Sequence, residues 1–236
     1  MSVLTVEALT VAFGRFTALD AVSLAVDPGE VRAVIGPNGA GKTTLLDVIS
    51  GVTKPVSGRV MLGDRIDLTK RSEAEIARAG VRRKFQKPSV FPALTLSENL
   101  EIGCGPALPA RDRPARIASV LAEIGLASRA AVPAGTLAHG EKQWLEIGMV
   151  LAAEPRLLLL DEPVAGLSDA ETAHTAALIR ALRRPDRVIL VIEHDMNFVE
   201  AIADRVTVLH EGRTLYEGSM PGARRDARVI EVFLGR

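Results

Sequence analysis

The chain has 236 residues, which is enough for one large α/β domain or two small ones with a substantial buried core. Its 29 basic and 29 acidic residues give a formal net charge of zero, so the positive field typical of nucleic-acid-binding proteins is excluded and we expect no nucleic-acid partner. The single cysteine, Cys104, excludes an intramolecular disulfide bond. Residues Met1 to Glu7 do not resemble a signal peptide, and no apolar run is long enough to span a bilayer, so we expect a cytoplasmic location.

The first elements form a small β-layer. Apolar and polar residues alternate from Leu4 to Leu9 and from Val22 to Val26, which predicts half-buried antiparallel strands. Between them, Phe13 precedes a glycine and is a candidate for stacking on an adenine ring. An ordinary core or hairpin aromatic is an equally good interpretation of Phe13, and Phe16 is the neighbouring alternative for the stacking role.

A phosphate-binding loop follows. An apolar run from Val31 to Ile35 predicts a strand, and Thr44 to Ser50 predicts a helix that ends at Gly51. Between them the glycines let backbone N–H groups surround a phosphate, Lys42 can reach the β- and γ-phosphates, and Thr43 offers its hydroxyl to Mg²⁺. The loop pattern G-x-x-x-x-G-K-T consists of Gly36, Pro37, Asn38, Gly39, Ala40, Gly41, Lys42 and Thr43, followed by Thr44. This pattern alone does not separate kinases, GTPases, motors and transport ATPases.

The next part of the chain is predicted to change from strand to helix. Gly58 to Leu62 predicts a strand, Ser72 and Glu75 have the spacing of a helix capping box, and a short basic stretch ends at Gln86. From Pro88 to about Pro155 we expect a helical insert, in which Ser97 begins one helix. The insert contains a proline-rich break and a helical apolar period, at Pro106, Pro109, Pro114, Ile117, Leu121 and Ile124.

Two buried strands are predicted to deliver polar groups to one crevice. The run Leu157 to Leu160 ends in Asp161 and Glu162, and Val188 to Ile192 ends before His194. Because ligands of open α/β sheets bind at the carboxyl ends of the strands, these side chains are expected beside the phosphate loop. One carboxylate can hold Mg²⁺, the other can orient or deprotonate a water, and a neutral imidazole can bind a phosphate oxygen.

Plainer interpretations exist for these strand ends. The sequence Asp161-Glu162-Pro163 can simply begin a loop, and a lone histidine such as His194 is often structural. Beyond them, Ser168 and Glu171 predict the capped start of a helix that reaches Arg183-Arg184. The tail is predicted to hold two short strands and a final helix ending at Leu234.

One further stretch, Leu137 to Gln143, is expected to precede a helix and indicates the family. With it, the chain resembles the ATP-binding subunits of ABC transporters, because six motifs stand in that family's order. They are the phosphate loop, Gln86 at the Q-loop, this signature stretch, the Walker B run ending at Glu162, a D-loop at Ala165 to Asp169, and the switch His194. The resemblance implies an α/β P-loop NTPase core with an N-terminal antiparallel β-layer. Residues 1–236 would form a single ATP-binding domain, with a helical subdomain inserted at about 88–155.

The resemblance also implies roles for individual residues toward ATP and Mg²⁺. Lys42 and the loop amides hold phosphate, and Thr43, Asp161 and Gln86 serve Mg²⁺. Glu162 is the catalytic base, His194 senses the γ-phosphate, and Phe13 stacks on adenine. Two subunits pair head to tail in this family, so the signature residues Ala138, His139, Gly140 and Glu141, together with Asp169, are expected at the ATP held by the opposite subunit.

The signature stretch departs from the usual family pattern L-S-G-G-Q. Ala138 replaces the serine, His139 the first glycine and Glu141 the glutamine. Loss of a hydroxyl that bonds a charged phosphate costs about 1.5 to 3 kcal/mol. We therefore expect a slow ATPase, or one that depends on a partner with a fuller signature.

Within the superfamily, the chain resembles the ATPases of the branched-chain amino-acid and urea uptake group, most closely the urea type. The resemblance rests on the stretches from Arg83 to Phe91, from Gly140 to Ile147 and from Asp161 to Gly166. It implies an ATP-hydrolysing subunit of an ABC importer for urea or a branched-chain amino acid, peripheral to the cytoplasmic face of the inner or plasma membrane.

The same resemblance implies the partners. They are membrane permease subunits, a second ATPase subunit in a homo- or heterodimer and, indirectly, a solute-binding protein. Val90 and Phe91 are expected to contact the permease, although Phe91 is about equally well interpreted as a core residue. The alternatives for the whole chain are a non-transport ABC protein and a regulatory module that binds ATP but scarcely cleaves it.

Overall fold

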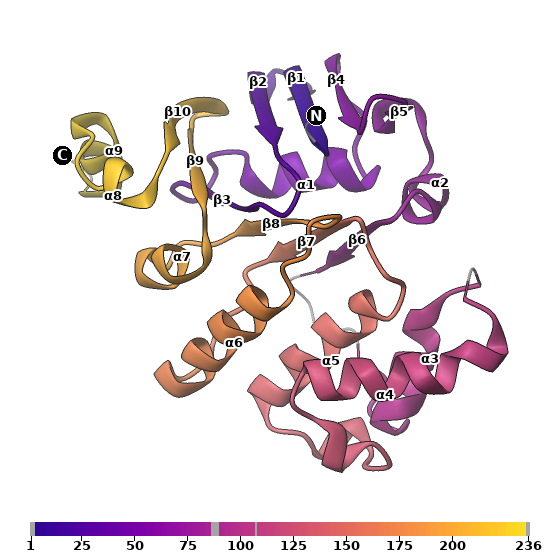
Figure 1. The fold of residues 1–236 in the computed structure, drawn as a ribbon. Coiled ribbons are helices and arrows are strands. Elements are labelled where there is room, and N and C mark those ends of the chain that lie inside the picture. Colours follow the sequence, from indigo (N-terminus) through magenta and orange to yellow (C-terminus); the bar gives the residue numbers. More distant parts are fainter. Residues whose placement is uncertain (1–2, 86–89, 107, 235–236) are drawn as a thin grey trace.

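The centre of the fold is a six-stranded sheet with strand order β10-β9-β3-β8-β7-β6 (Figure 1). The computed structural model describes residues 3–85, 90–106 and 108–234. Strands β9, β3, β8, β7 and β6 run parallel, and β10 pairs antiparallel with β9. The bounds are β3 (Val31–Ile35), β6 (Val81–Lys84), β7 (Leu157–Asp161), β8 (Val188–Ile192), β9 (Arg205–His210) and β10 (Arg213–Gly218). Every residue of β3, β7 and β8 is buried, which confirms the strands predicted from apolar runs.

A second, antiparallel sheet has strand order β2-β1-β4-β5 and confirms the predicted N-terminal β-layer. Its strands are β1 (Leu4–Phe13), β2 (Phe16–Val26), β4 (Ser57–Leu62) and β5 (Ile66–Asp67). The hairpin of β1 and β2 extends to the pair Phe13 and Phe16, beyond the alternating segments used for its prediction. Helix α1 (Lys42–Ser50) lies between the two sheets (Figure 1) and ends at Gly51, as predicted.

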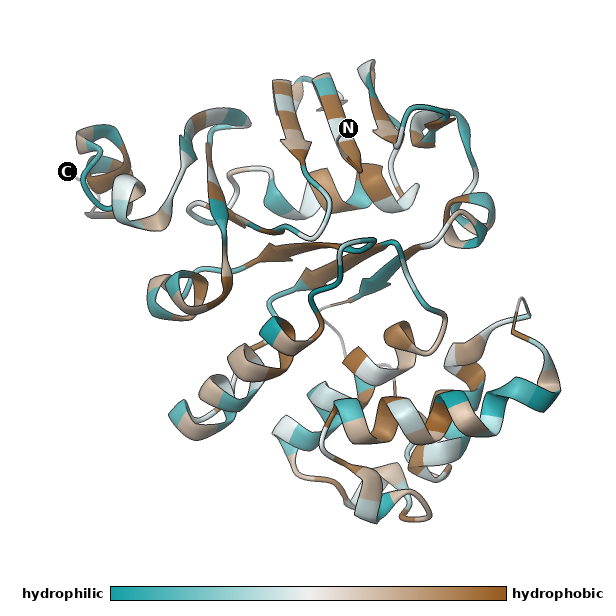
Figure 2. Ribbon diagram, in the orientation of Figure 1, coloured by the Kyte–Doolittle hydropathy of each residue, from teal (hydrophilic) through white to brown (hydrophobic). Residues whose placement is uncertain are grey.

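The central sheet separates two hydrophobic cores because successive side chains of a strand point to opposite faces. Leu157 and Leu159 pack with α1 and the antiparallel sheet, whereas Leu158 and Leu160 pack with the helices on the other face. Strands β7 and β8 are accordingly hydrophobic over most of their length in Figure 2, whereas β6 is largely hydrophilic. Both faces of the central strands are therefore covered.

Between β6 and β7 the described chain is helical, as expected for the insert. The helices are α3 (Leu96–Cys104), α4 (Arg113–Glu123) and α5 (His139–Leu151), and an isolated bridge joins Thr95 to Pro133. They lie together below one end of the central sheet (Figure 1). Their shared core contains Leu100, Val120 and Leu145, which explains the apolar helical period in the sequence.

One boundary prediction at each of the helices α3, α4 and α6 (Asp169–Ala181) was wrong. Thr95, not Ser97, caps α3: its Oγ1 accepts the N–H of Glu98 at 3.2 Å, and the Glu98 carboxylate accepts the N–H of Thr95 at 2.7 Å. Pro114 does not break the chain, because it lies in the first turn of α4, where no helical partner for its nitrogen is needed. Helix α6 ends before Arg183, although its predicted capping box from Ser168 is confirmed.

Buried polar contacts attach the helical segment to the sheet. Lys84, at the end of β6, lies 3.4 Å from Glu146 on α5, and both side chains are almost fully buried. Burial lowers the pKa of Lys84, and the charge of Glu146 opposes that effect. On the same helix, Nε1 of Trp144 donates to Oγ1 of Thr175 on α6 at 3.0 Å. Helix α5 is thus fixed to both the sheet and α6.

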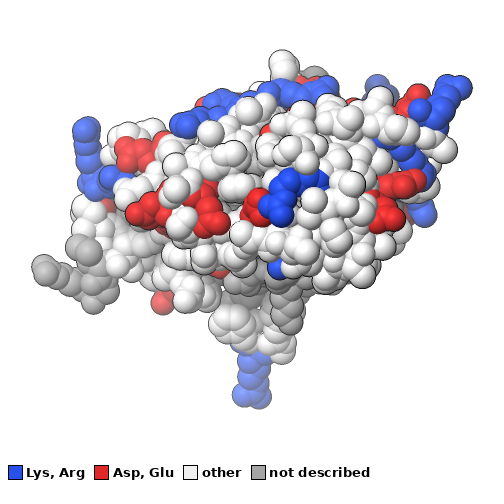
Figure 3. Space-filling model, turned by 90° about the horizontal axis from the view of Figure 1, so that it is seen from below, with Lys and Arg blue, Asp and Glu red and all other residues white. Residues whose placement is uncertain are grey.

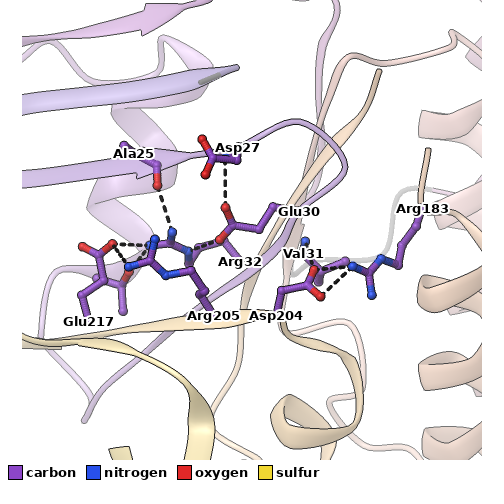
Figure 4. A network of polar contacts seen from close by, with 10 residues as sticks. Ala25, Asp27, Glu30, Val31, Arg32, Arg183, Asp204, Arg205 and Glu217 are labelled. Carbon is purple, nitrogen blue, oxygen red and sulfur yellow. Dashed lines mark hydrogen bonds and ion pairs between the residues drawn. The ribbon is translucent and has the colours of Figure 1, made fainter. Parts of the chain in front are cut away.

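The other half of the sheet, from β3 to β10, carries a buried arginine network (Figure 4). Arg32 on β3 is fully buried, and its Nε donates to Glu30 at 2.6 Å. Its Nη1 donates to Glu217 on β10 at 3.0 Å, and its Nη2 to the carbonyl of Ala25 on β2 at 2.9 Å. Arg205 also reaches Glu217, at 3.1 Å, from an exposed position. The network joins the antiparallel sheet to β3 and to β10.

The remaining helices surround these sheets. They are α2 (Glu73–Arg78), α7 (Met196–Ile202), α8 (Met220–Ala223) and α9 (Ala227–Leu234). The capping box of Ser72 and Glu75 begins α2, as predicted. The final helix is confirmed as α9, although the short α8 precedes it. Both follow β10 in the chain (Figure 1).

The surface seen from below in Figure 3 carries both acidic and basic side chains, with uncharged areas between them. No charge of one sign dominates that face. None of the helices in the described part of the chain has the length and hydropathy that crossing a bilayer requires.

Candidate functional site

The loop from Gly36 to Gly41 joins β3 to α1 and is shaped by close backbone contacts. Gly36 has φ 152°, and a Cβ there would lie 2.2 Å from the carbonyl oxygen of Leu209 on β9. Gly41 has φ 98°, and its Cβ would lie 2.6 Å from the carbonyl oxygen of Ala18 on β2. Both positions therefore require glycine. The loop is packed between strands of both sheets, with Asn38 and Gly39 exposed at its tip.

Lys42 is the first residue of α1, and its ammonium turns back over the loop. Nζ donates to the carbonyl oxygens of Gly36 at 2.8 Å and of Pro37 at 2.9 Å. Burial lowers the pKa of Lys42, while the charges of Glu162 and Asp161 oppose that effect. The lysine thus stands within electrostatic reach of the predicted catalytic base, Glu162, and of the predicted Mg²⁺ ligand, Asp161. Thr43 and Thr44 follow it in the first turn of α1.

The two carboxylates stand at the end of β7 in different surroundings. Asp161 is the last residue of the strand and is buried, whereas the Glu162 side chain is partly exposed. Glu162 has φ 46°, a left-handed conformation that is uncommon outside glycine, and its N–H donates to the carbonyl of Ile192 at 3.0 Å. This turn directs the chain out of the sheet immediately after Asp161.

His194 lies beside Glu162 at the end of β8. Its Nδ1 is 3.9 Å from Oε1 of Glu162, and its ring is largely exposed. The neighbouring Glu193 is buried and accepts the N–H groups of Val164 at 3.2 Å and of His194 at 3.0 Å. Burial raises the pKa of Glu193, and the two hydrogen bonds to its carboxylate act in the opposite direction by lowering it. Asp195 caps α7 by accepting the N–H groups of two residues, so Glu193 and Asp195 support the backbone at the crevice edge.

One hollow of about 540 Å³ brings several of the predicted residues together, although Lys42, Thr43 and Asp161 are not among those that line it. It is lined by Gly36, Pro37, Asn38, Glu162, His194, Val232 and Phe233. The strand-end argument is therefore confirmed for Glu162 and His194, which face the phosphate loop from two neighbouring strands. The wall formed by Val232 and Phe233 of α9 was not predicted, because nothing in the sequence indicates where the last helix packs.

Other predicted residues lie elsewhere. Phe13 and Phe16 form the exposed tip of the β1–β2 hairpin, at 54% and 62% exposure, and neither lines the hollow. This placement excludes the core interpretation of Phe13, and its adenine role stays a prediction. Gln86 lies outside the described residues.

Comparison with known proteins identifies the family. The sequence model described as ABC transporter matches residues 19–165, which is more than half of the chain. The chain belongs to the ABC transporter family. Together with the relatives and solved structures that match the chain, this result confirms the predicted family, fold class and activity as an ATP-hydrolysing importer subunit.

Several relatives match this cassette over nearly its whole length. The high-affinity branched-chain amino acid transport ATP-binding protein BraF of Pseudomonas aeruginosa is 38% identical, covering 99% of the cassette and 98% of BraF. The corresponding protein LivG of Escherichia coli K12 is 37% identical, with 98% and 97% covered. An arabinose import ATP-binding protein, AraG 2 of Burkholderia ambifaria, is 37% identical over 91% of the cassette and 42% of its own length.

Solved structures agree with the fold of the cassette. The ATP-binding cassette MJ1267 of an ABC transporter superposes with a TM-score of 0.90 at 31% identity, covering 99% of both chains. The cassette MJ0796, solved as a dimer in a post-hydrolysis state with ADP and Pi, gives a TM-score of 0.79 at 26% identity, covering 92% of this chain and 98% of that one.

The signature residues of the cassette lie apart from its own hollow. Helix α5 begins at His139, inside the signature stretch, so the prediction that the stretch precedes the helix was wrong. The reason is the residue Glu141, whose carboxylate accepts the N–H of Ala138 at 3.0 Å and thereby starts the helix early. Gly140 lies against Glu171 on α6, since a Cβ at Gly140 would be 2.3 Å from Oε1 of Glu171, and Asp169 is the first residue of that helix. None of the signature residues lines the hollow.

Replacing Ala138 by serine is expected to stabilise the cassette. Ala138 is the N-cap of α5, with extended backbone angles and no side-chain acceptor. A serine hydroxyl can accept the N–H of Glu141 and complete the capping box, which adds about 1 kcal/mol to the free energy of unfolding. Urea denaturation measures this gain. The hypothesis of a weakened signature further expects a faster ATPase and tighter nucleotide binding in Ala138→Ser, and unchanged values would contradict that hypothesis.

Sequence reasoning missed Arg83 as a partner of the site. Its Nη2 donates to Oδ2 of Asp161 at 2.8 Å, and its Nη1 to Oδ1 of Asp47 on α1 at 2.6 Å. The available signal was a basic side chain inside a strand next to a buried strand that ends in aspartate. A buried strand position requires a counter-charge for such a residue.

Proposed function

We propose that this cassette binds Mg²⁺-ATP in the hollow between the phosphate loop and the ends of β7 and β8, and that hydrolysis there powers solute uptake. The observation that carries the proposal is the convergence of Gly36, Glu162 and His194 on one hollow. Lys42 compensates the phosphate charge from the loop. Glu162 orients and deprotonates the attacking water, and His194 contacts the γ-phosphate. Phe13 is proposed to stack on the adenine.

The residues of the site suit Mg²⁺. Thr43 offers a hydroxyl and Asp161 a carboxylate, and both are oxygen donors of the kind that Mg²⁺ prefers. Among the described residues, no group of three His, Cys, Asp or Glu side chains could hold a metal ion by itself. Mg²⁺ at nucleotides is held by one or two carboxylates together with phosphates and waters, so a site with the single carboxylate of Asp161 fits. When bound, the ion neutralises charge on the phosphates; Gln86 is proposed as its third protein contact.

We further propose that two such subunits pair head to tail. The signature residues Ala138 to Glu141 and Asp169 of one subunit would then face the ATP of the other. This arrangement explains why a cassette with an intact phosphate loop keeps its signature away from its own hollow. In this proposal the chain is one domain in which residues 88–155 form the inserted helical subdomain.

The membrane partner is proposed to be a permease that contacts the cassette near the end of β6. A hollow of about 360 Å³ there is lined by Val52, Ile76 and Phe85, among other residues. Phe91 is 46% exposed, which argues against the alternative of a core role for this residue. Through this contact the cassette would lie peripherally on the cytoplasmic face of the membrane, and a solute-binding protein would act through the permease.

The proposed solute is a branched-chain amino acid, because BraF and LivG match this chain over nearly all of its length. Urea, the prediction from subfamily motifs, is the second candidate. Uptake of labelled leucine and labelled urea in a strain without this gene distinguishes them, with the Lys42→Ala chain as the control for complementation. We expect loss of leucine uptake that only the wild-type gene restores. Selective loss of urea uptake would favour the urea type, and loss of neither would contradict both solutes.

A further inference from the structure

Arg83 is a buried arginine whose guanidinium joins the phosphate-loop helix to the carboxylate at the end of β7. Its side chain is 5% exposed. Nη2 donates to Oδ2 of Asp161 at 2.8 Å, while Nη1 donates to Oδ1 of Asp47 at 2.6 Å and to Oγ of Ser50 at 3.2 Å. Asp47 and Ser50 both lie on α1. One side chain of β6 therefore contacts two other elements of the site.

The surroundings of Arg83 allow its guanidinium little freedom. The ring of Phe85 lies 4.8 Å from the guanidinium carbon and covers one side of the group. The Asp161 side chain is also only 5% exposed, so water does not compete strongly for this ion pair. Because the fork of an arginine is planar and rigid, its position fixes the direction of each bound carboxylate.

The hydrogen bond from Arg83 determines which carboxylate oxygen of Asp161 is already occupied. Oδ2 accepts from Arg83, and that hydrogen bond restricts rotation of the carboxylate about its bond to the chain. The ammonium of Lys42 stands within electrostatic reach of Asp161 and is a competing cation for it. Arg83 opposes such a pairing by holding the carboxylate from the side of β6. Hydrogen-bond partners of this kind orient metal-binding carboxylates in proteins.

We infer that Arg83 is a positioning residue that sets the direction of the Asp161 carboxylate toward Mg²⁺-nucleotide. The inference rests on the proposed function, since it assumes that Asp161 serves the Mg²⁺ of bound ATP. It adds a residue from the strand β6, which the six family motifs do not include. It also assigns a role at the site to one of the basic side chains of that strand.

The test replaces Arg83 by glutamine, which removes the charge and the fork. A fluorescent ADP analogue is titrated with and without Mg²⁺. The quantity measured is the Mg²⁺ concentration that produces half of the Mg²⁺-dependent gain in affinity for the analogue. We expect this concentration to rise about 10- to 100-fold, the usual loss when a supporting contact of a metal ligand is removed. Affinity for the analogue without Mg²⁺ is expected to be unchanged. The Mg²⁺ requirement of Arg83→Lys is expected to lie between those of the wild-type protein and Arg83→Gln, because one ammonium cannot bind both carboxylates through a fork.

Arg82→Gln is the matched control on the same strand. Arg82 donates to the carbonyl of Ala77, away from Asp161, so its removal is expected to leave the Mg²⁺ requirement unchanged. A purely structural role of Arg83 would lower the melting temperature of Arg83→Gln without changing that requirement. An unchanged requirement in the folded Arg83→Gln protein would therefore overturn the inference.

A second variant serves if Arg83→Gln does not fold. Asp47→Asn loosens the guanidinium from the α1 side, at a position that is partly exposed. A several-fold rise of the Mg²⁺ requirement is expected, and no rise would overturn the inference. If the proposed function is wrong, the result is different: the wild-type protein binds no nucleotide, or its affinity for nucleotide does not depend on Mg²⁺. That result would overturn both.

Discussion

Replacing Glu162 by glutamine is expected to lower the steady-state ATPase rate by about 10²- to 10⁴-fold, the usual contribution of a general base. Glutamine keeps the size of the side chain but cannot accept the proton of the attacking water. The left-handed backbone at this position and its hydrogen bond to Ile192 are unaffected by the change, so the hollow should keep its shape. Nucleotide binding should therefore persist while cleavage stops.

The same variant also tests the proposed pair. If cleavage separates two subunits that share ATP, Glu162→Gln with ATP should accumulate as a dimer in light scattering, whereas wild-type protein returns to monomer as ATP is consumed. Asp195→Asn is the matched control, because it changes a nearby carboxylate whose role is to cap α7 and asparagine is an equally good cap. Failure of the mass to double would contradict the head-to-tail mechanism, and an unchanged ATPase rate would contradict the role of Glu162.

Replacing Arg32 by methionine is expected to lower the free energy of unfolding by about 3 to 5 kcal/mol, as removal of one partner of a buried ion pair does. Glu30 would remain buried at 7% side-chain exposure without its cation, and the links from β3 to β2 and β10 would be lost. Urea denaturation measures the effect.

Arg205→Met is the control for this prediction, because it removes the other contact of Glu217 from an exposed position. Exposed ion pairs contribute at most about 1 kcal/mol, so its effect should be much smaller. Changing Glu30 to glutamine in the Arg32→Met protein should recover part of the loss, since the uncompensated charge disappears. Equal effects of Arg32→Met and Arg205→Met would show that burial does not determine how much the network contributes to the free energy of unfolding.

The features that sequence predicted well are those encoded over a few consecutive residues. The strands β3 and β8 have the predicted limits, because a short apolar run between turn residues has few other structures available. The capping boxes at Ser72 and Ser168 were predicted from a spacing of three residues. The glycines of the phosphate loop are part of a motif that itself describes a backbone shape.

Two errors at helix starts arose because the two halves of a capping box were not considered together. Thr95 and Ser97 are both good cap residues two positions apart, but only Thr95 has a glutamate three residues later that can return the hydrogen bond. The early start of α5 has the same cause, since Glu141 supplies one half of a capping box around an alanine. A capping residue is therefore predicted better when both halves of the box are considered.

What sequence alone determined about this protein is the presence and order of its motifs, and with them the family, the chemistry of the phosphate loop and the two strands that carry Glu162 and His194. What only the tertiary structure decided is which distant side chains meet. Arg83 and Asp161 are 78 residues apart, and Arg32 and Glu217 are 185 apart. Such pairs depend on the order of strands in the sheet and on the burial that the packed helices create. A periodic pattern specifies the face on which a residue lies, whereas its partner is fixed only when the parallel strands and α1 are brought together.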